Sequence, residues 1–244
     1  MSALYDRIGL DYAALRRPDP RIAAAIDAGL GDAATVLNVG AGAGSYEPRG
    51  RDLTALEPSA AMIAQRPEGA APCLQGSAEA LPFPDASFDA AMGVLTVHHW
   101  PDQPRGMAEM RRVARRRIVL LTFDPAHPGS WLADYLPELR DLDTAQMPPL
   151  EAYGEWLGQV DIAPLPIPHD CRDGFLYAYW RRPEAYLDAR VRGAISSFHA
   201  LNCEAGLARL ESDLADGTWR AKYGELLDRE TLDCGYRIVA AQLG

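Results

Sequence analysis

A short apolar run that ends in three closely spaced glycines restricts the fold of this chain more than any other feature. Residues Thr35–Val39 (TVLNV) have the β-branched and apolar character of a buried strand, and the loop GAGAG follows at residues 40–44. Glycine tolerates positive φ angles and lets a ligand approach the main chain closely. A strand that ends in such a turn predicts an α/β sheet with a ligand site beyond the carboxyl end of its first strand.

The first half of the chain alternates apolar runs with helical segments, which is the pattern of a parallel α/β sheet. Further strands are expected at Leu53–Leu56, Ala71–Leu74, Phe88–Leu95 and Ile118–Phe123. Helices are expected at Asp19–Leu30, Ser59–Gln65 and Gln103–Val113. Ser59 and Asp102 carry short polar side chains of the kind that cap helix N-termini, so the second and third helices have defined starts.

The second half of the chain has a different character. Helices at Trp131–Leu139 and Leu150–Leu157 and a sixth strand near Val160–Ile167 precede residues 174–232, which are predicted to be almost wholly helical. The chain closes with a last strand, Tyr236–Leu243. A doubly wound sheet does not need a helical insert before its last strand, and such inserts often form a lid over a pocket.

The balance of charge argues against a polyanionic partner. Lys and Arg together number 24 against 34 Asp and Glu, which gives a formal net charge of −10 with neutral histidines. Such a chain is poorly suited to bind nucleic acid or an anionic membrane surface, and the arginines within residues 111–117 are interpreted as a solvated face beside an apolar strand. No apolar run approaches the ~20 residues that span a bilayer.

The N-terminus and the cysteines indicate the compartment. The N-terminal residues lack the basic-then-apolar order of a secretion signal. Cys73, Cys171, Cys203 and Cys234 stand far apart, without the spacing of a redox pair or a metal site. We therefore expect reduced thiols, no metal site and a cytoplasmic location.

Two features beside the first strand narrow the identity of the ligand. Glu57 ends the second strand, where a carboxylate can accept hydrogen bonds from two ribose hydroxyls. With the glycine loop, this arrangement suits a dinucleotide as well as an adenosyl compound. The dinucleotide fingerprint has Gly or Ala at its last position, where this chain has Ser45, and the mismatch gives some support to the adenosyl compound.

Four segments in the first half carry a family resemblance. They are VLNVGAGAGSYE, LTALEPSAAMIAQRP, LQGSAEALPFPDASFDAAMGVLTVHHWPD and AEMRRVARRRIVLLTFDP. In this order and spacing the chain resembles the class I S-adenosylmethionine-dependent methyltransferases, in particular the small-molecule branch that includes ubiquinone-biosynthesis and trans-aconitate methyltransferases. The resemblance covers about residues 10–125 and the last strand.

The fold implied by the resemblance is α/β: a doubly wound, Rossmann-like, mostly parallel seven-stranded sheet with an antiparallel last strand and a helical lid inserted before it. A single methyltransferase domain is expected over residues 1–244. Its parts would be an N-terminal cap segment (1–30), a cofactor-binding core (31–125), connecting helices with the sixth strand (126–173), the helical lid (174–232) and the last strand (233–244).

The resemblance also implies S-adenosylmethionine as methyl donor, S-adenosylhomocysteine as product and a small-molecule acceptor. The donor-binding residues that it implies lie near the ends of the first four strands; they are Gly40, Ala41, Gly42, Glu57, Pro58, Met62, Ser77, Ala78 and Leu95. The loop would pass beside the methionine portion, and Glu57 would hold the ribose. Pro58 and Met62 would pack on the adenine, Ser77 and Ala78 would lie at its edge, and Leu95 would lie under the sulfonium.

Two further donor contacts are implied: one departs from the family's pattern, and the other has a second interpretation. Asn38 stands where the family commonly has an acidic residue, and its amide can accept one hydrogen bond from the donor's amino group without charge assistance. Tyr12 and Arg17 resemble the family's entry segment and would reach the donor's carboxylate, with Arg16 as the alternative. A surface arginine pair before a helix is the other interpretation of that segment.

The chemistry is expected after the fourth strand. The methyl group would point toward Thr96–Trp100, where His98 or His99, with an ordinary pKa of about 6.5, could take a proton. Adjacent side chains point in different directions, so at most one is expected to face the pocket, and a purely structural role for both is the alternative. Substrate contacts are expected from Asp124, His169, Arg172, Tyr177 and Trp180, although packing within the lid is the favoured interpretation for most of the aromatic residues.

Two other functions stay open at the level of sequence. An NAD-dependent oxidoreductase would use a similar glycine loop and acidic residue. A methyltransferase-like protein could instead bind the donor as a sensor or scaffold without transferring its methyl group. The acceptor group is open as well: a hydroxyl would benefit from a nearby base, and a carboxylate would need none.

Overall fold

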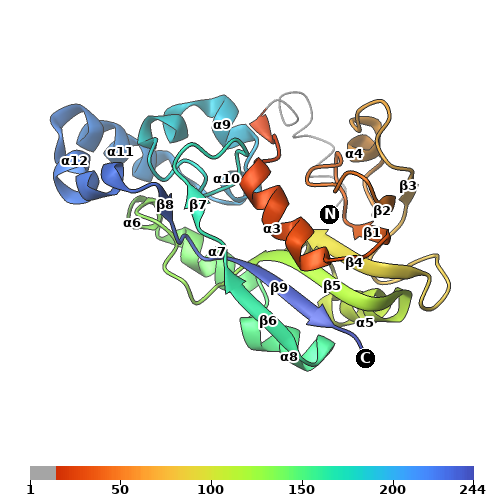
Figure 1. Cartoon of the computed structure of the whole chain (residues 1–244). Helices are drawn as coiled ribbons and strands as arrows, with labels where there is room; N and C mark the ends of the chain where they lie inside the picture. The colour runs from red at the N-terminus through yellow and green to blue at the C-terminus, as the bar shows by residue number, and fades with distance from the viewer. Residues whose placement is uncertain (1–14) are drawn as a thin grey trace.

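The computed structural model describes residues 15–244, and its centre is a seven-stranded sheet (Figure 1). The strands are β1 (Thr35–Val39), β2 (Asp52–Glu57), β3 (Cys73–Gln75), β4 (Phe88–Val94), β5 (Ala114–Phe123), β6 (Val160–Pro164) and β9 (Tyr236–Gln242). Their order across the sheet is β3-β2-β1-β4-β5-β9-β6. Strands β1 to β5 pair in parallel, whereas β9 runs antiparallel to both of its neighbours, so the predicted fold class is confirmed.

The strand order reverses at β1, and this reversal positions the ligand site. From β1 the chain moves outward through β2 to β3 and then returns to the other side of β1 as β4. The loops that leave β1 and β4 therefore diverge at the carboxyl edge of the sheet, where open α/β sheets form their crevice. The glycine loop at residues 40–44 and the segment Thr96–Trp100 both lie at this edge.

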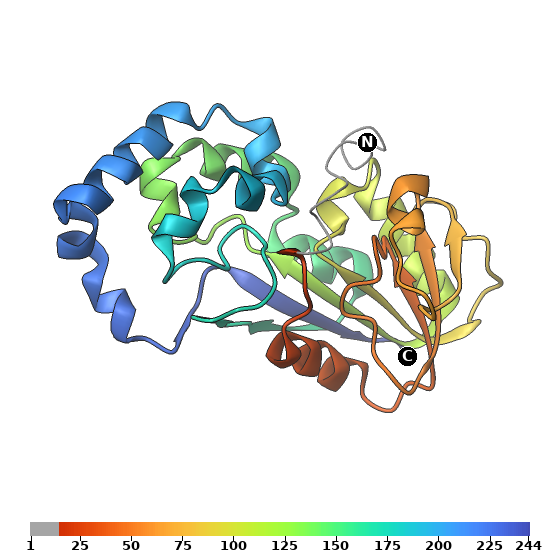
Figure 2. The same ribbon diagram turned by 90° about the horizontal axis from the view of Figure 1, so that it is seen from above.

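Helices cover both faces of the sheet (Figures 1 and 2). On one face, α3 (Pro20–Leu30) buries Ile22, Ile26 and Leu30 in the same apolar cluster as residues of β1 and β5. On the other face, α5 (Gln103–Val113) and α8 (Leu150–Leu157) share a second cluster with residues of the same strands. The central strands β1, β4 and β5 are thus covered on both sides, which explains why they are mostly apolar, whereas the edge strands β3 and β6 are more exposed.

The two capping residues expected from the sequence, Ser59 and Asp102, are confirmed, and Asp19 caps a third helix. Asp19, Ser59 and Asp102 precede α3, α4 (Ala60–Ala64) and α5, and each side chain accepts a hydrogen bond from a backbone N–H of the first turn, at 3.0, 3.3 and 3.0 Å. These bonds satisfy N–H groups that the helix itself leaves without acceptors.

The remaining helices form a lid beyond the end of β5, on one side of the sheet in Figure 2. They are α6 (Leu132–Tyr135), α7 (Glu138–Gln146), η2 (Pro183–Leu187), α9 (Ala189–Gly193), α10 (Ser196–Ala200), α11 (Glu204–Asp216), α12 (Thr218–Tyr223) and η3 (Gly224–Asp228). Trp131 lies at the centre of the lid, where its indole N–H donates to the Trp180 carbonyl and its ring packs edge-on against Tyr186 and Trp219. The lid therefore has an aromatic core of its own, continuous with the cluster on the α3 face.

Several predicted boundaries in the second half are wrong. The sixth strand ends at Pro164, and Ile167–Pro168 forms a separate short strand, β7, that pairs with β8 (Thr231–Leu232). Proline has no N–H for a strand ladder, so alternate prolines at 164, 166 and 168 prevent one continuous strand. The helix expected at Trp131–Leu139 is divided at residues 136–137, just before α7, by Pro137, which cannot continue a helix from the preceding turn.

Two further expectations need correction. Residues 174–182 form turns rather than helix, although most of the following lid is helical. The strand expected from Ile118 begins at Ala114, so the arginines at 115–117 lie within β5 itself. Arg115 and Arg116 pair with Asp89 and Asp32 at the sheet's amino edge, where both guanidinium groups are half-exposed. In the part of the chain that the structure describes, no helix is long and apolar enough to cross a membrane.

Candidate active site

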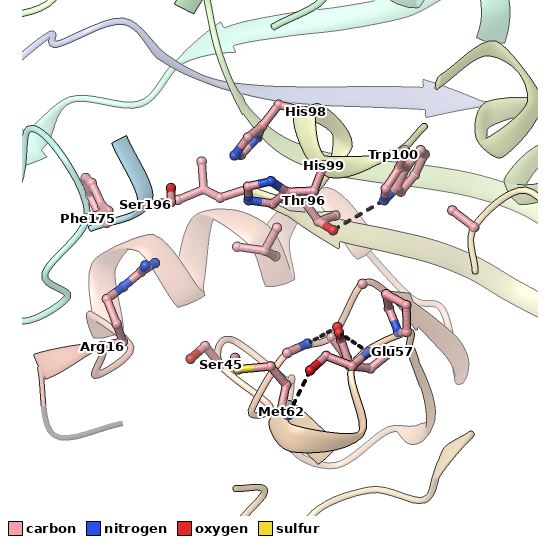
Figure 3. Close-up of a pocket in the computed structure, with 18 of the residues that line it drawn as sticks. Arg16, Ser45, Glu57, Met62, Thr96, His98, His99, Trp100, Phe175 and Ser196 are labelled. Carbon is pink, nitrogen blue, oxygen red and sulfur yellow. Dashed lines mark hydrogen bonds between the residues drawn. The ribbon is translucent and has the colours of Figure 1, made fainter. Parts of the chain in front are cut away.

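A pocket opens where the glycine loop, the ends of β2 and β4, and the lid meet (Figure 3). Its sheet side includes Asn38, Gly40, Ala41, Gly42, Ser45, Tyr46, Glu57, Pro58, Met62, Ser77, Ala78, Leu95, Thr96, His98 and His99. Its lid side includes Asp143, Met147, Phe175, Leu176, Ile195, Ser196 and Ser197. In Figure 3, Glu57 and Met62 lie on one side of the opening and His98 and His99 lie on the other.

The glycine loop is held tightly against both neighbouring strands. The backbone N–H groups of Gly40 and Ala41 donate to the carbonyl of Leu56 at 2.8 and 3.0 Å. Gly40 has φ +70°, and a Cβ there would lie 1.9 Å from the Thr96 hydroxyl oxygen. Only glycine fits this position, because any side chain would collide with the segment that follows β4. The loop therefore presents bare main chain to the pocket.

Glu57 connects the glycine loop to the start of α4. One carboxylate oxygen accepts from the Gly42 N–H at 2.8 Å, and the other accepts from the Ser59 N–H at 2.9 Å. Burial raises the pKa of Glu57, and the two N–H donors and the guanidinium of Arg66 oppose that rise. Each carboxylate oxygen can accept more than one hydrogen bond, so this fixed group can still bind a pair of ligand hydroxyls.

Asn38 offers the pocket a buried acceptor. Its side chain lies at the carboxyl end of β1, is 1% exposed, and donates from Nδ2 to Glu47 at 3.3 Å. Its Oδ1 atom has no hydrogen-bond partner among the described residues. A buried carbonyl oxygen without a donor is unfavourable, so this position suits a ligand that brings an N–H group.

Both histidines after β4 line the pocket, which corrects the expectation that at most one would face it. They lie in the 3-10 helix η1 (Val97–His99), and their ring centroids are 3.8 Å apart (Figure 3). Burial is the main cause that holds the pKa of His98 well below 6.5 and lowers that of His99 to about 4. Nearby Arg16 adds to both shifts. Both imidazoles are therefore neutral near pH 7, the form that can accept a proton.

The entry segment places Arg16, not Arg17, at the pocket. The guanidinium of Arg16 pairs with the buried carboxylate of Asp173 at 2.6 Å, and the hydroxyl of Tyr46 donates to the same carboxylate at 2.9 Å. Arg17 is exposed and lies outside the pocket lining, so the assignment to Arg17 is corrected in favour of the alternative. Tyr12 lies outside the described residues.

Comparisons with known proteins agree with this geometry. Residues 37–121 match the family model described as "Methyltransferase domain". A 2-methyl-6-phytyl-1,4-hydroquinone methyltransferase of Oryza sativa subsp. japonica is 36% identical over 83 residues, which cover 34% of this chain and 23% of that protein. A malonyl-[acyl-carrier protein] O-methyltransferase of Erwinia pyrifoliae is 41% identical over 91 residues, covering 35% of each chain.

A solved structure extends the similarity to the lid. The protein, described as a methyltransferase from an antibiotic biosynthesis pathway of Anabaena variabilis, is 37% identical, and the match covers 94% of this chain and 99% of that one with a TM-score of 0.86. This chain belongs to the S-adenosylmethionine-dependent methyltransferases. The methyltransferase spans about a quarter of the length of the first curated relative, so the similarity to that protein concerns only part of each chain.

The donor residues expected from the sequence are brought together in this methyltransferase. Except for Arg17 and the undescribed Tyr12, all of them line one pocket, from Asn38 and the glycine loop to Leu95. The pocket offers main chain without side chains, a fixed carboxylate at Glu57 and the unpaired Asn38 oxygen. These features fit the amino, ribose and methionine portions of S-adenosylmethionine.

The acceptor residues expected from the sequence do not line the methyltransferase's pocket. Asp124 turns toward Arg237 at 3.5 Å, and His169 lies 3.4 Å from Glu230. Arg172 is exposed. Tyr177 and Trp180 are buried within the lid, where the Trp180 indole N–H donates to the Ile167 carbonyl. The structure therefore does not bring these side chains to the pocket, and all of them except Arg172 are held by contacts within the lid or at its base.

The lid side of the methyltransferase's pocket is instead formed by residues outside the predicted substrate set. Phe175 and Leu176 come from the turn that opens the lid, and Ser196 comes from α10. Asp143 comes from α7, where it follows Leu139 by four residues and is buried on the same side of the helix. That helical spacing, with a carboxylate in place of an apolar residue, is the signal that could have identified Asp143.

Proposed function

We propose that this methyltransferase transfers the methyl group of S-adenosylmethionine to a small-molecule acceptor and releases S-adenosylhomocysteine. The observation that carries the proposal is one pocket lined by the glycine loop, Glu57, Asn38, His98, His99 and the lid, in which Glu57 lies across the opening from the two histidines (Figure 3). When bound, the donor supplies a methyl group already activated by its positive sulfonium. The protein's task is then to align the acceptor and to exclude water.

On the donor side, each group has a role that its environment supports. Glu57, fixed by two backbone N–H groups, accepts hydrogen bonds from the ribose hydroxyls. The unpaired Oδ1 of Asn38 accepts from the donor's amino group. Met62 and Pro58 pack on the adenine, Ser77 and Ala78 border its edge, and Arg16 approaches the donor's carboxylate from the entry segment.

On the acceptor side, the lid supplies a mostly apolar wall. Phe175, Leu176 and Ile195 limit the access of water to the space beside Leu95, which marks the end of β4. His98 and His99 are neutral near pH 7 and can accept a hydrogen bond from the acceptor; their lowered pKa values make them weak bases, suited to a proton that becomes acidic as the new bond to carbon forms. An acceptor that loses a proton on methylation therefore finds a base within the pocket.

Calorimetry with the full chain tests the donor half of this proposal. S-adenosylmethionine and S-adenosylhomocysteine should both give saturable heats, whereas NAD should give none. Incubation with methyl-labelled donor and a pool of small hydroxyl, amine and carboxylate compounds tests the second half. Label in an extractable small molecule supports transfer. Tight donor binding with no transfer to any member would contradict it and favour a sensor or scaffold, and NAD binding in place of the donor would favour an oxidoreductase.

A further inference from the structure

Asp143 is a buried carboxylate for which residues 15–244 provide no hydrogen-bond or ion-pair partner. It lies in the last turns of α7, is 7% exposed and lines the acceptor side of the pocket. Its main-chain carbonyl accepts from the Met147 N–H at 2.8 Å, but within residues 15–244 its carboxylate makes no hydrogen bond or ion pair. The other buried carboxylates of the site differ, since Glu57 accepts two backbone N–H groups and Asp173 binds Arg16.

The charged and titratable groups around Asp143 do not neutralise it. Arg140 stands one turn earlier on α7, but its guanidinium is half-exposed and directed to Asp134 at 3.6 Å. Tyr177 and Tyr236 are buried close enough that the Asp143 charge raises the pKa of each, after the larger effect of their own burial. Burial alone raises the pKa of Asp143 to about 7. A carboxylate in such surroundings is ionised at a large energetic penalty unless a cation joins it.

The cations of the pocket are held elsewhere. Arg16 is paired with Asp173, and the two histidines are neutral near pH 7. The acceptor side therefore has one unpartnered carboxylate among aromatic and apolar side chains, including Phe123, Phe175 and Tyr236. A carboxylate ligand would be repelled there, whereas an ammonium group would pair with Asp143 and could also contact aromatic faces.

We propose that Asp143 binds a basic nitrogen of the methyl acceptor, so that the acceptor is an amine with an apolar or aromatic body. This inference rests on the proposed function, because it takes the lid side of the pocket to be the acceptor site. Asp143 acts here as a positioning residue: its carboxylate anchors the ammonium group at the lid side of the pocket. The carboxylate acceptor left open by the sequence is thereby disfavoured.

Ligand binding in the presence of the spent donor tests this role. The full chain is saturated with S-adenosylhomocysteine and titrated calorimetrically with phenethylamine and tryptamine, with the alcohols of the same skeletons, and with phenylacetate and indoleacetate. At least one amine should bind at least about tenfold more tightly than its alcohol and its carboxylate. Asp143→Asn should remove that preference, and exposed Asp141→Asn, on the same helix, should keep it.

The outcomes separate the two proposals. If S-adenosylhomocysteine does not bind, the proposed function itself fails. If it binds normally but neither amine binds more tightly than its alcohol and carboxylate, or neither binds at all, the inference about Asp143 is wrong. The inference is also wrong if Asp143→Asn still binds an amine more tightly than its alcohol and carboxylate. A second readout uses the wild-type chain: carbon NMR of labelled aspartate should show the Asp143 carboxyl titrating near neutral pH, and saturating amine should move that titration to lower pH. An unmoved titration in the presence of a bound amine would also overturn the inference.

Discussion

The Glu57 carboxylate accepts a hydrogen bond of 2.8 Å from the backbone N–H of Gly42. This contact joins the end of β2 to the loop that leaves β1, two segments that meet only because the strands are parallel neighbours in register. The carboxylate is buried, and two backbone N–H groups hold it with no side-chain cation of residues 15–244 in direct contact. Its position is therefore fixed before a ligand arrives, which reduces the entropy lost on binding.

Removal of that carboxylate should weaken donor binding. Glu57→Ala should raise the Kd for S-adenosylhomocysteine by about 10- to 150-fold, the range expected for lost hydrogen bonds to a charged group at about 1.5–3 kcal/mol. Calorimetry measures the effect, and exposed Glu68→Ala is the matched control. An unchanged affinity in Glu57→Ala would remove Glu57 from the ribose role.

The glycine loop should not tolerate even one added methyl group. Gly40→Ala places a Cβ 1.9 Å from the Thr96 hydroxyl at a φ of +70°, so both a collision and backbone strain arise. We expect the free energy of unfolding to fall by about 2–4 kcal/mol. Gly50→Ala separates the two causes, because Gly50 has φ +79° with no atom within 4 Å of the new Cβ. Denaturant unfolding should show a loss of only about 1 kcal/mol for Gly50→Ala, and equal losses in the two variants would contradict the collision.

The sequence predicted those parts of the molecule that depend on local signals. The strand TVLNV and the helix Gln103–Val113 with its N-cap are encoded within a few residues, and the structure has them at the expected positions. The acceptor side could not be predicted in this way. Phe175 and Asp143 lie 32 residues apart in the sequence and reach one pocket only through the packing of the lid. Both histidines line the pocket because they are adjacent in the short 3-10 helix η1, which runs along the pocket's edge.

The half-buried histidines of η1 should make folding sensitive to acid. In the unfolded chain a histidine takes up a proton near pH 6.5, whereas the pKa of folded His99 is about 4. The stability that neutral His99 contributes is thus fully present above pH 6.5 and is lost as the pH falls toward 4. His99→Gln should reduce the loss of unfolding free energy between these pH values by about 1–3 kcal/mol. Denaturant titrations at several pH values measure this, exposed His199→Gln should behave like the wild type, and an unaltered slope in His99→Gln would show that His99 is not the acid-sensitive group.

Asp143 should change stability with pH in the opposite sense. Its folded pKa of about 7 lies above the ordinary value of 3.8, so the folded chain holds the proton more tightly than the unfolded chain does. Ionisation of Asp143 therefore removes stability as the pH rises from about 4 to 7. Asp143→Asn should raise the free energy of unfolding at pH 8 by roughly 2–4 kcal/mol and leave it nearly unchanged at pH 4. Denaturant unfolding at both pH values decides this, and the control Asp141→Asn should leave the free energy of unfolding nearly unchanged at both. A gain at pH 4 equal to that at pH 8 would mean that better packing, rather than the removal of an unpaired buried charge, stabilises the variant.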